Sequence, residues 1–123
     1  MRPGREVERV ALDVTLLYFD DCPNRQTTEA RLTRLGVEYV FELKRRKVAT
    51  ADEAEQIGFR GSPTVLIDGL DPWADANAPV GMSCRRYRGP NGSIGSPTEE
   101  MLRQALDAAR QSDTRQSQPR KTG

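Results

Sequence analysis

The stretch "IGFRGSPTVLIDG", residues 57–69, combines several turn-forming residues with a short apolar run. Its second half, residues 64–68, is short, apolar and β-branched. Pro63 and Gly69 bound this half, and both residue types are typical of the turns at which strands begin and end. The stretch therefore predicts a turn followed by a short, buried strand.

A short helix is predicted immediately before that turn. Thr50 is followed three residues later by Glu53, which is the spacing of a helix capping box. Gly58 favours the left-handed backbone conformation in which helices commonly end. We therefore expect a helix of about two turns that ends near Gly58.

Toward the N-terminus, the sequence predicts a strand, a helix and a second strand. Residues 14–19 are apolar and aromatic with little alternation, as in a central strand that is covered on both faces. Pro23 suits the first turn of a helix, and Gly36 would end that helix. Residues 37–43 then alternate between apolar and polar side chains, which indicates a strand with one buried face.

Toward the C-terminus, residues 69–83 are polar and rich in turn-formers, so they predict a long loop. Residues 84–88, "CRRYR", are expected to return as a further strand. Ser96, followed by Pro97 and then by Glu99, has the pattern of a helix N-cap with a capping box. Apolar residues recur at helical spacing after this cap: Met101, Leu102, Ala105, Leu106 and Ala109.

Together, these elements predict an α/β domain with a four-stranded mixed central sheet flanked by three helices. We assign this domain to residues 9–110. Residues 1–8 and 111–123 are polar, and they are expected to form flexible tails because they offer too few apolar side chains to offset the entropy lost on ordering.

The composition excludes several classes of function. The 123 residues include 19 basic and 18 acidic side chains, and this balance argues against a nucleic-acid partner. No secretory signal and no membrane-spanning run is recognisable, so we expect a cytoplasmic protein without a membrane partner. The absence of histidine excludes Ser-His, Cys-His and His-rich zinc sites. Any chemistry must therefore come from thiols, carboxylates, hydroxyls and the backbone.

Cys22 is the strongest candidate for that chemistry. It directly precedes the predicted helix, whose N-terminal N–H groups and dipole favour a thiolate. Arg25 would support the negative charge, whereas Asp21 would oppose it. Three interpretations of Cys22 stay open at this point: a redox thiol, a metal or mercury ligand, and a small core residue.

Cys84 is a candidate second thiol. In a cytoplasmic chain, two cysteines are expected to be reduced rather than joined in a structural disulfide. If residues 84–88 form a simple hairpin with the preceding strand, Cys84 lies opposite the end farthest from Pro63, beyond the Cα separation of about 7 Å that a disulfide tolerates. The loop 69–83 is also long enough to return Cys84 toward Cys22. Packing within a strand is the simpler interpretation of Cys84.

Two motifs resemble the thioredoxin-like superfamily. Residues 57–69 resemble the thioredoxin segment that leads into its cis-proline strand, with matches at Gly58, Phe59, Arg60, Gly61, Pro63 and Thr64. Residues 14–23, "VTLLYFDDCP", resemble the first strand and active-site turn of glutaredoxins, where Cys22 matches the nucleophilic cysteine. Several pieces are also similar to a group of small actinobacterial thioredoxin-like proteins that are often labelled alkylmercury lyase: residues 22–24, 61–64, 71–72, 78–81 and 84–88.

The resemblance implies that Cys22 faces a cis peptide bond before Pro63 across an accessible site, where Ser62, Pro63 and Thr64 bind the substrate. Arg25 stands where a dithiol enzyme has its resolving cysteine. The implied activity is therefore monothiol thiol–disulfide exchange with a small molecule or an extended peptide. Glutathione is the expected co-substrate, and no other cofactor is implied.

Two alternatives follow from the same residues. Cys22 and Cys84 would suit a mercury-binding or alkylmercury lyase-like protein, in which Asp20 or Asp21 acts as the acid. A thioredoxin-like fold without catalysis would instead be an interaction module, because a fold does not by itself imply a function.

Overall fold

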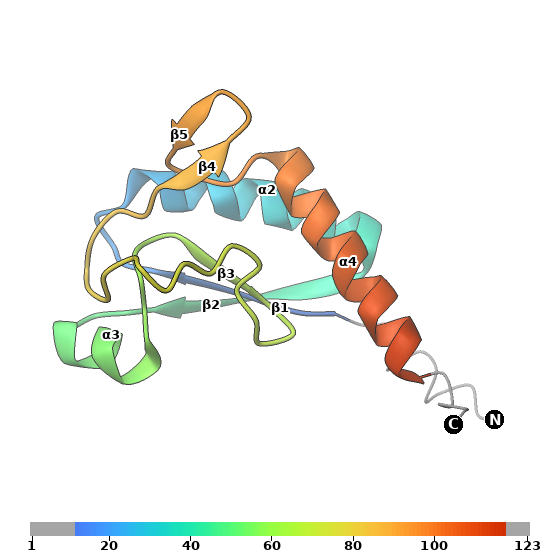
Figure 1. Cartoon of the computed structure of the whole chain (residues 1–123), viewed down its shortest axis with the longest axis horizontal. Coiled ribbons are helices and arrows are strands. Elements are labelled where there is room, and N and C mark those ends of the chain that lie inside the picture. The colour runs from blue at the N-terminus through green and yellow to red at the C-terminus, as the bar shows by residue number, and fades with distance from the viewer. Residues whose placement is uncertain (1–11, 118–123) are drawn as a thin grey trace.

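The computed structural model describes residues 12–117 of the chain, with side chains described for residues 12–111. Its elements, in chain order, are β1 (Leu12–Tyr18), α2 (Pro23–Tyr39), β2 (Phe41–Lys47), α3 (Ala51–Ile57), β3 (Thr64–Ile67), β4 (Tyr87–Gly89), β5 (Gly92–Ile94) and α4 (Glu99–Ser117) (Figure 1). The expected tail at residues 1–8 lies outside the described residues. Helix α4 extends to Ser117, within the segment 111–123 that was predicted as a tail.

The central sheet is mixed and has the strand order β2-β1-β3. Strand β1 runs parallel to β2 and antiparallel to β3. The predicted fourth strand at residues 84–88 is wrong, because β4 pairs with β5 in a separate two-stranded sheet. Local turn chemistry explains this outcome: Pro90 and Asn91 form the turn, and Gly92 follows with a φ of 127°, which favours glycine.

Helices cover both faces of the central sheet, which gives three layers (Figure 1). Side chains alternate between the two faces of β1, so Val14 and Leu16 join one apolar cluster and Leu17 joins the other. The larger cluster lies between the sheet and helices α2 and α4. The smaller one contains Ala54 of α3 and Phe59. Burial on both faces explains why the sequence of β1 shows little alternation.

Helix α2 is longer than predicted. It continues past Gly36 to Tyr39 and ends at Val40, which adopts a left-handed φ of 59°. The predicted strand at residues 37–43 is therefore wrong in its first half, and Val37, placed on the buried face of that strand, is 83% exposed. Tyr39 is buried at helical spacing from Leu35 and contacts α4, so helical packing overrides the alternating pattern.

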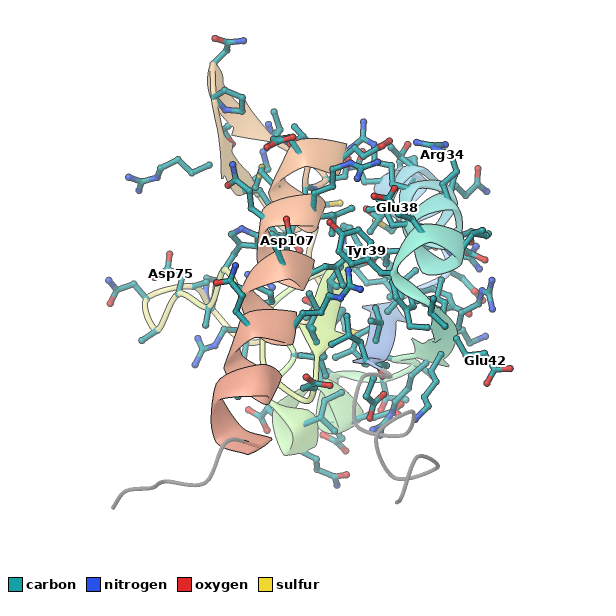
Figure 2. The ribbon with its side chains drawn as sticks, turned by 90° about the vertical axis from the view of Figure 1, so that its right-hand side faces the viewer. Arg34, Glu38, Tyr39, Glu42, Asp75 and Asp107 are labelled. Carbon is teal, nitrogen blue, oxygen red and sulfur yellow. The ribbon has the colours of Figure 1, made fainter. Side chains whose placement is uncertain are left out.

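A polar contact joins the two helices on this side of the sheet. Figure 2 shows Tyr39 of α2 directed toward Asp107 of α4, and its hydroxyl donates to the Asp107 carboxylate at 2.8 Å. Burial raises the pKa of Tyr39, and the hydrogen bond to Asp107 raises it further. Nearby, Arg103 lowers the pKa of Glu38 through a 2.7 Å hydrogen bond. Helix α4 is thus held against α2 by polar as well as apolar contacts.

The expected cap of α3 is confirmed. The Thr50 hydroxyl accepts a hydrogen bond from the Glu53 amide at 3.1 Å, and Gly58 ends the helix with a φ of 70°. The Glu53 carboxylate accepts a hydrogen bond from the Ala49 amide rather than from Thr50 itself, and this bond lowers the pKa of Glu53. The cap fixes where the chain turns toward β3.

The cap of α4 is two residues later than predicted. The Thr98 hydroxyl accepts from the Met101 amide at 3.0 Å, and the helix begins at Glu99. Ser96 instead accepts a hydrogen bond from Arg31 of α2. A long-range contact therefore engages the first candidate cap, and the second serves the helix.

Candidate functional site

Cys22 is the residue that caps the N-terminus of α2, as its sequence position indicated. Pro23 begins the helix, and the Cys22 amide donates to the Phe19 carbonyl at 3.3 Å, which fixes the turn after β1. The Cys22 thiol donates to the carbonyl of Ser62 at 3.4 Å. Two segments that are far apart in sequence thus meet at a sulfur atom.

Ser62 is the centre of this site. Its side-chain oxygen accepts a hydrogen bond from the Phe19 amide at 3.4 Å, which ties it to the turn that carries Cys22. The Ser62–Pro63 peptide bond is cis, as expected. Ser62, Pro63 and Thr64 are all buried, and the Thr64 hydroxyl donates to the Gly61 carbonyl at 2.6 Å. The structure therefore brings Cys22 together with the three predicted substrate contacts.

The expected accessible site is not open. Cys22 is only 3% exposed and Ser62 is fully buried. The backbone edge of Ser62 is already paired, because its amide donates to the Ser83 carbonyl and its carbonyl accepts from the Arg85 amide, both at 2.9 Å. Residues 83–85, which we call the strap, cover the position that a substrate strand was expected to take.

The strap decides between the two positions that the sequence left open for Cys84, and it leaves Cys84 exposed rather than packed within a strand. Cys84 forms an isolated parallel bridge with Ser62 instead of lying at the far end of β3. The long loop returns it to the site, as the second of the two geometries allowed. Both cysteines are free thiols, with Cys22 buried and Cys84 exposed. Both therefore border the same residue, Ser62.

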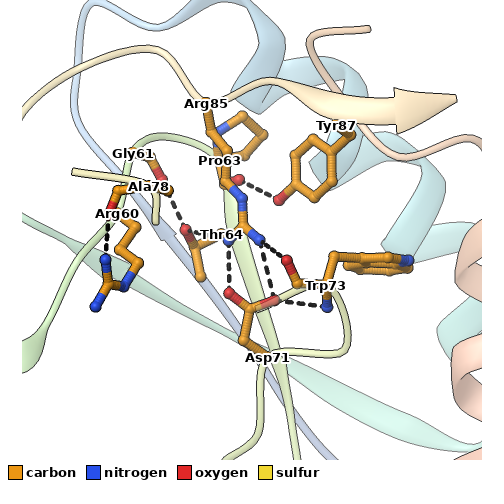
Figure 3. Close-up of polar contacts among 9 residues, drawn as sticks. All are labelled: Arg60, Gly61, Pro63, Thr64, Asp71, Trp73, Ala78, Arg85 and Tyr87. Carbon is orange, nitrogen blue, oxygen red and sulfur yellow. Dashed lines mark hydrogen bonds and ion pairs between the residues drawn. The ribbon is translucent and has the colours of Figure 1, made fainter. Parts of the chain in front are cut away.

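A buried arginine holds the strap in place (Figure 3). Arg85 is 7% exposed, and its guanidinium donates to both oxygens of the Asp71 carboxylate at 2.6 and 3.2 Å. It also donates to the Trp73 carbonyl at 2.6 Å and to the Thr64 hydroxyl at 3.1 Å. Such planar, bidentate pairing is specific to arginine. We call Arg85 with these partners the arginine clamp.

Tyr87 completes the inner wall of the site. Its hydroxyl donates to the Pro63 carbonyl, and its ring meets Trp73 edge-on at 5.6 Å between centroids (Figure 3). Burial raises the pKa of Tyr87; Arg85 opposes this shift, while Asp71 and Cys22 add to it. Trp73 packs against the larger core cluster, so it anchors the long loop.

The two predicted tuning residues are directed elsewhere. Arg25 pairs with Glu29 at 3.0 Å and lies 4.2 Å above the ring of Tyr18. Asp21 is exposed, and its neighbour Asp20 pairs with Lys47 at 2.9 Å. None of the polar contacts described within residues 12–111 joins Arg25 or Asp21 to the Cys22 thiol. No direct contact therefore supports the predicted effect of these two side chains on the Cys22 thiol.

A surface cavity of about 770 Å³ borders the strap on its outer side. Cys84 contributes to its wall, whereas Cys22 does not. Most of the charged residues in the lining are arginines, and one is acidic: Arg60, Arg85, Arg86, Arg88 and Asp75. A second cavity, of about 640 Å³, lies near the end of α2 and has no cysteine in its lining. Of these two cavities, only the first has both a cysteine and arginines in its wall.

Sequence reasoning missed Asp71, Arg85 and Tyr87 as residues of the site. A weak signal was available, since Asp71 and Arg85 carry opposite charges near the two ends of the long loop. That signal is not specific, because 30% of the chain is charged. The contact depends on the path of the loop, which the sequence does not specify.

Comparison with known proteins gives no relative: no family model, curated protein or solved structure matches this chain significantly. None of the helices within residues 12–117 is long and apolar enough to cross a membrane. The same residues contain no group of three or more cysteine, aspartate and glutamate side chains arranged to hold a metal ion. The function must therefore be argued from the geometry around Ser62.

Proposed function

We propose that this chain is a thioredoxin-like thiol–disulfide oxidoreductase in which Cys22 is the nucleophile and Ser62 presents the substrate. One observation carries the proposal: the Cys22 thiol contacts the Ser62 carbonyl at 3.4 Å, at the N-terminus of a helix. The mixed sheet, with β1 between β2 and β3, supports the thioredoxin-like assignment. This sheet has one strand fewer than we predicted, so we propose a reduced form of that fold.

The helix N-terminus would supply the chemistry. In this proposal Cys22 reacts as a thiolate, and the negative charge of that thiolate lies at the positive end of the helix dipole of α2. The first turn contains no acidic residue that would oppose this charge. A thiolate in this position attacks one sulfur of a disulfide, a mixed disulfide forms at Cys22, and the other sulfur leaves as a thiolate.

Ser62 would orient the sulfur that is attacked. Its amide and carbonyl are the groups that pair with an extended strand, and the Cys22 thiol lies against the same carbonyl. A disulfide carried by a strand paired with Ser62 is thus held beside the nucleophile. An external substrate has to displace the strap, because the strap occupies both groups of Ser62.

Replacement of Cys22 by serine tests the proposal. The Cys22→Ser variant keeps a small side chain that can still donate to Ser62, so we expect it to fold and to lose most of its exchange activity, with only the exposed Cys84 thiol left to react. Release of glutathione from a glutathionylated peptide, with reduced glutathione as co-substrate, measures this activity. Urea unfolding of both proteins provides the control for folding. Wild-type activity in the variant would show that Cys22 is not the nucleophile.

Mercury binding is a second candidate, and one observation favours it: both thiols border Ser62. Thiolates are soft ligands that bind soft metal ions. The absence of a three-residue ligand group within residues 12–117 limits this candidate to binding by two thiols. Stoichiometric mercury binding that needs Cys22 and Cys84 equally, in a protein without disulfide exchange, would favour it over the first proposal.

A further inference from the structure

We propose that Cys84 is a relay thiol: an external disulfide reacts first at Cys84, and Cys22 then attacks the sulfur of Cys84 to form an internal disulfide. The strap is in this view a tethered substrate strand. The inference rests on the proposed role of Cys22 as nucleophile, and it names the sulfur that Cys22 attacks.

The difference in exposure between the two thiols is the first argument. Cys84 is exposed and lies in the wall of the 770 Å³ cavity, whereas Cys22 is 3% exposed and lies outside that wall. Because thiol–disulfide exchange requires access to the sulfur, an external disulfide meets Cys84 first. Cys22 lies inside the site, next to Ser62.

The position of the strap is the second argument. Cys84 is the bridge partner of Ser62, and paired strands lie about 4.8 Å apart. The Cys22 sulfur lies 3.4 Å from the carbonyl oxygen of the same residue. A disulfide needs its two Cα atoms within about 7 Å, so the strap has to bring Cys84 within that distance of Cys22 for the two thiols to join.

The two sides of Cys84 are held differently. On its C-terminal side, Arg85 is held by the arginine clamp and by the hydrogen bond that its amide donates to the Ser62 carbonyl. On its N-terminal side, residues 71–83 form neither helix nor strand, and the Ser83 carbonyl accepts a hydrogen bond from the Ser62 amide. The clamp thus sets the register of Cys84, and the hydrogen bonds between the strap and Ser62 have to break before Cys84 can move.

The proposed reaction balances in two exchanges. The Cys84 thiolate attacks a disulfide RSSR, which forms Cys84–S–S–R and releases the first thiolate RS⁻. The Cys22 thiolate then attacks the Cys84 sulfur, which forms the Cys22–Cys84 disulfide and releases a second RS⁻. Each released thiolate takes up the proton that the corresponding cysteine lost. The two cysteines are oxidised, and RSSR is reduced to two RSH.

The lining of the cavity indicates the class of disulfide. Arg85 in the wall that contains Cys84 is paired with Asp71, and the other three arginines of this wall outnumber its one acidic residue, Asp75. Positive charge around a cavity raises the local concentration of anions. We therefore assign the cavity to a small, negatively charged disulfide of the oxidised glutathione type.

Mass spectrometry of the full chain after treatment with oxidised glutathione tests the relay. Wild-type, Cys22→Ser and Cys84→Ser proteins are sampled over time, quenched in acid, and mapped by peptide. We expect linked Cys22 and Cys84 peptides in the wild type, a persistent glutathione adduct on Cys84 in Cys22→Ser, and a large loss of the Cys22 oxidation rate in Cys84→Ser. Repeating the reaction at lower protein concentration confirms that the linkage is within one chain.

The outcomes separate the two proposals. If Cys22 becomes glutathionylated in Cys84→Ser as fast as it is oxidised in the wild type, the relay is wrong and the role of Cys22 stands. If the wild type carries only a stable adduct on Cys84, both proposals fail. Cys22→Ala replaces Cys22→Ser if the serine variant does not fold. An uncharged disulfide, 2-hydroxyethyl disulfide, should react more slowly than oxidised glutathione, and equal rates would contradict the assignment of an anionic ligand.

Discussion

The Arg85→Met variant is expected to lose about 3–5 kcal/mol of unfolding free energy, because removing one partner of a buried ion pair leaves the other charge uncompensated. Asp71 is that other charge, and its side chain is 17% exposed. The Thr64 hydroxyl and the Trp73 carbonyl lose a donor at the same time. Methionine keeps an unbranched side chain over the ring of Tyr87, so the loss reports mainly on polar contacts.

Urea unfolding measures this effect, and Arg88→Met is the matched control. Arg88 is an exposed arginine close to Arg85 in sequence. Substitutions at exposed sites of this kind usually change stability by about 0.5 kcal/mol or less. Equal losses in the two variants would show that the arginine clamp does not stabilise the fold. Loss of the clamp should also increase the rate at which Cys22 is alkylated in native buffer.

Gly61→Ala is expected to displace the strap from Ser62. Gly61 has a φ of 114°, where a residue with a side chain costs about 1–3 kcal/mol. Its new Cβ would also lie 3.0 Å from the Ser83 carbonyl oxygen and 3.0 Å from the Arg85 Cβ, both in the strap. The variant should therefore be less stable than the wild type and should expose Cys22.

Gly69→Ala is the matched control for this variant. Gly69 also has a positive φ, of 82°, but a Cβ there would meet no heavy atom within 4 Å. It should share the backbone cost of Gly61→Ala without moving the strap. Alkylation of Cys22, located by peptide mass spectrometry, should be faster than wild type in Gly61→Ala and unchanged in Gly69→Ala. The same acceleration in both variants would mean that general destabilisation, not the strap, controls access.

Local signals predicted the cap of α3 and the position of β3 correctly, but they placed the cap of α4 two residues too early. The cap of α3 depends on Thr50 and Glu53, which are close in sequence, and β3 is bounded by residues that form turns. The end of α2 was missed because Tyr39 is held by α4, a partner far away in sequence. The central sheet was predicted with one strand too many, because β4 pairs with β5 in a hairpin and not with the central sheet.

The candidate site was likewise predictable where sequence motifs specify it and not where a distant contact does. The juxtaposition of Cys22 and Ser62 could be expected, since two recognisable motifs carry it. The approach of Cys84 could not, because it depends on the path of the long loop and on the ion pair between Asp71 and Arg85. The sequence left open whether Cys22 is a buried core residue or a reactive thiol, and the structure shows that it is buried.

Alkylation of Cys22 at low urea concentrations distinguishes a reactive thiol beneath a movable strap from an inert core cysteine. Local opening exposes little new surface, so its free energy hardly depends on urea, whereas the free energy of global unfolding falls steeply with urea. We expect Cys84 to be labelled at once and Cys22 more slowly, at a rate that is independent of urea well below the unfolding transition. A Cys22 rate that follows global unfolding at every urea concentration would contradict the account.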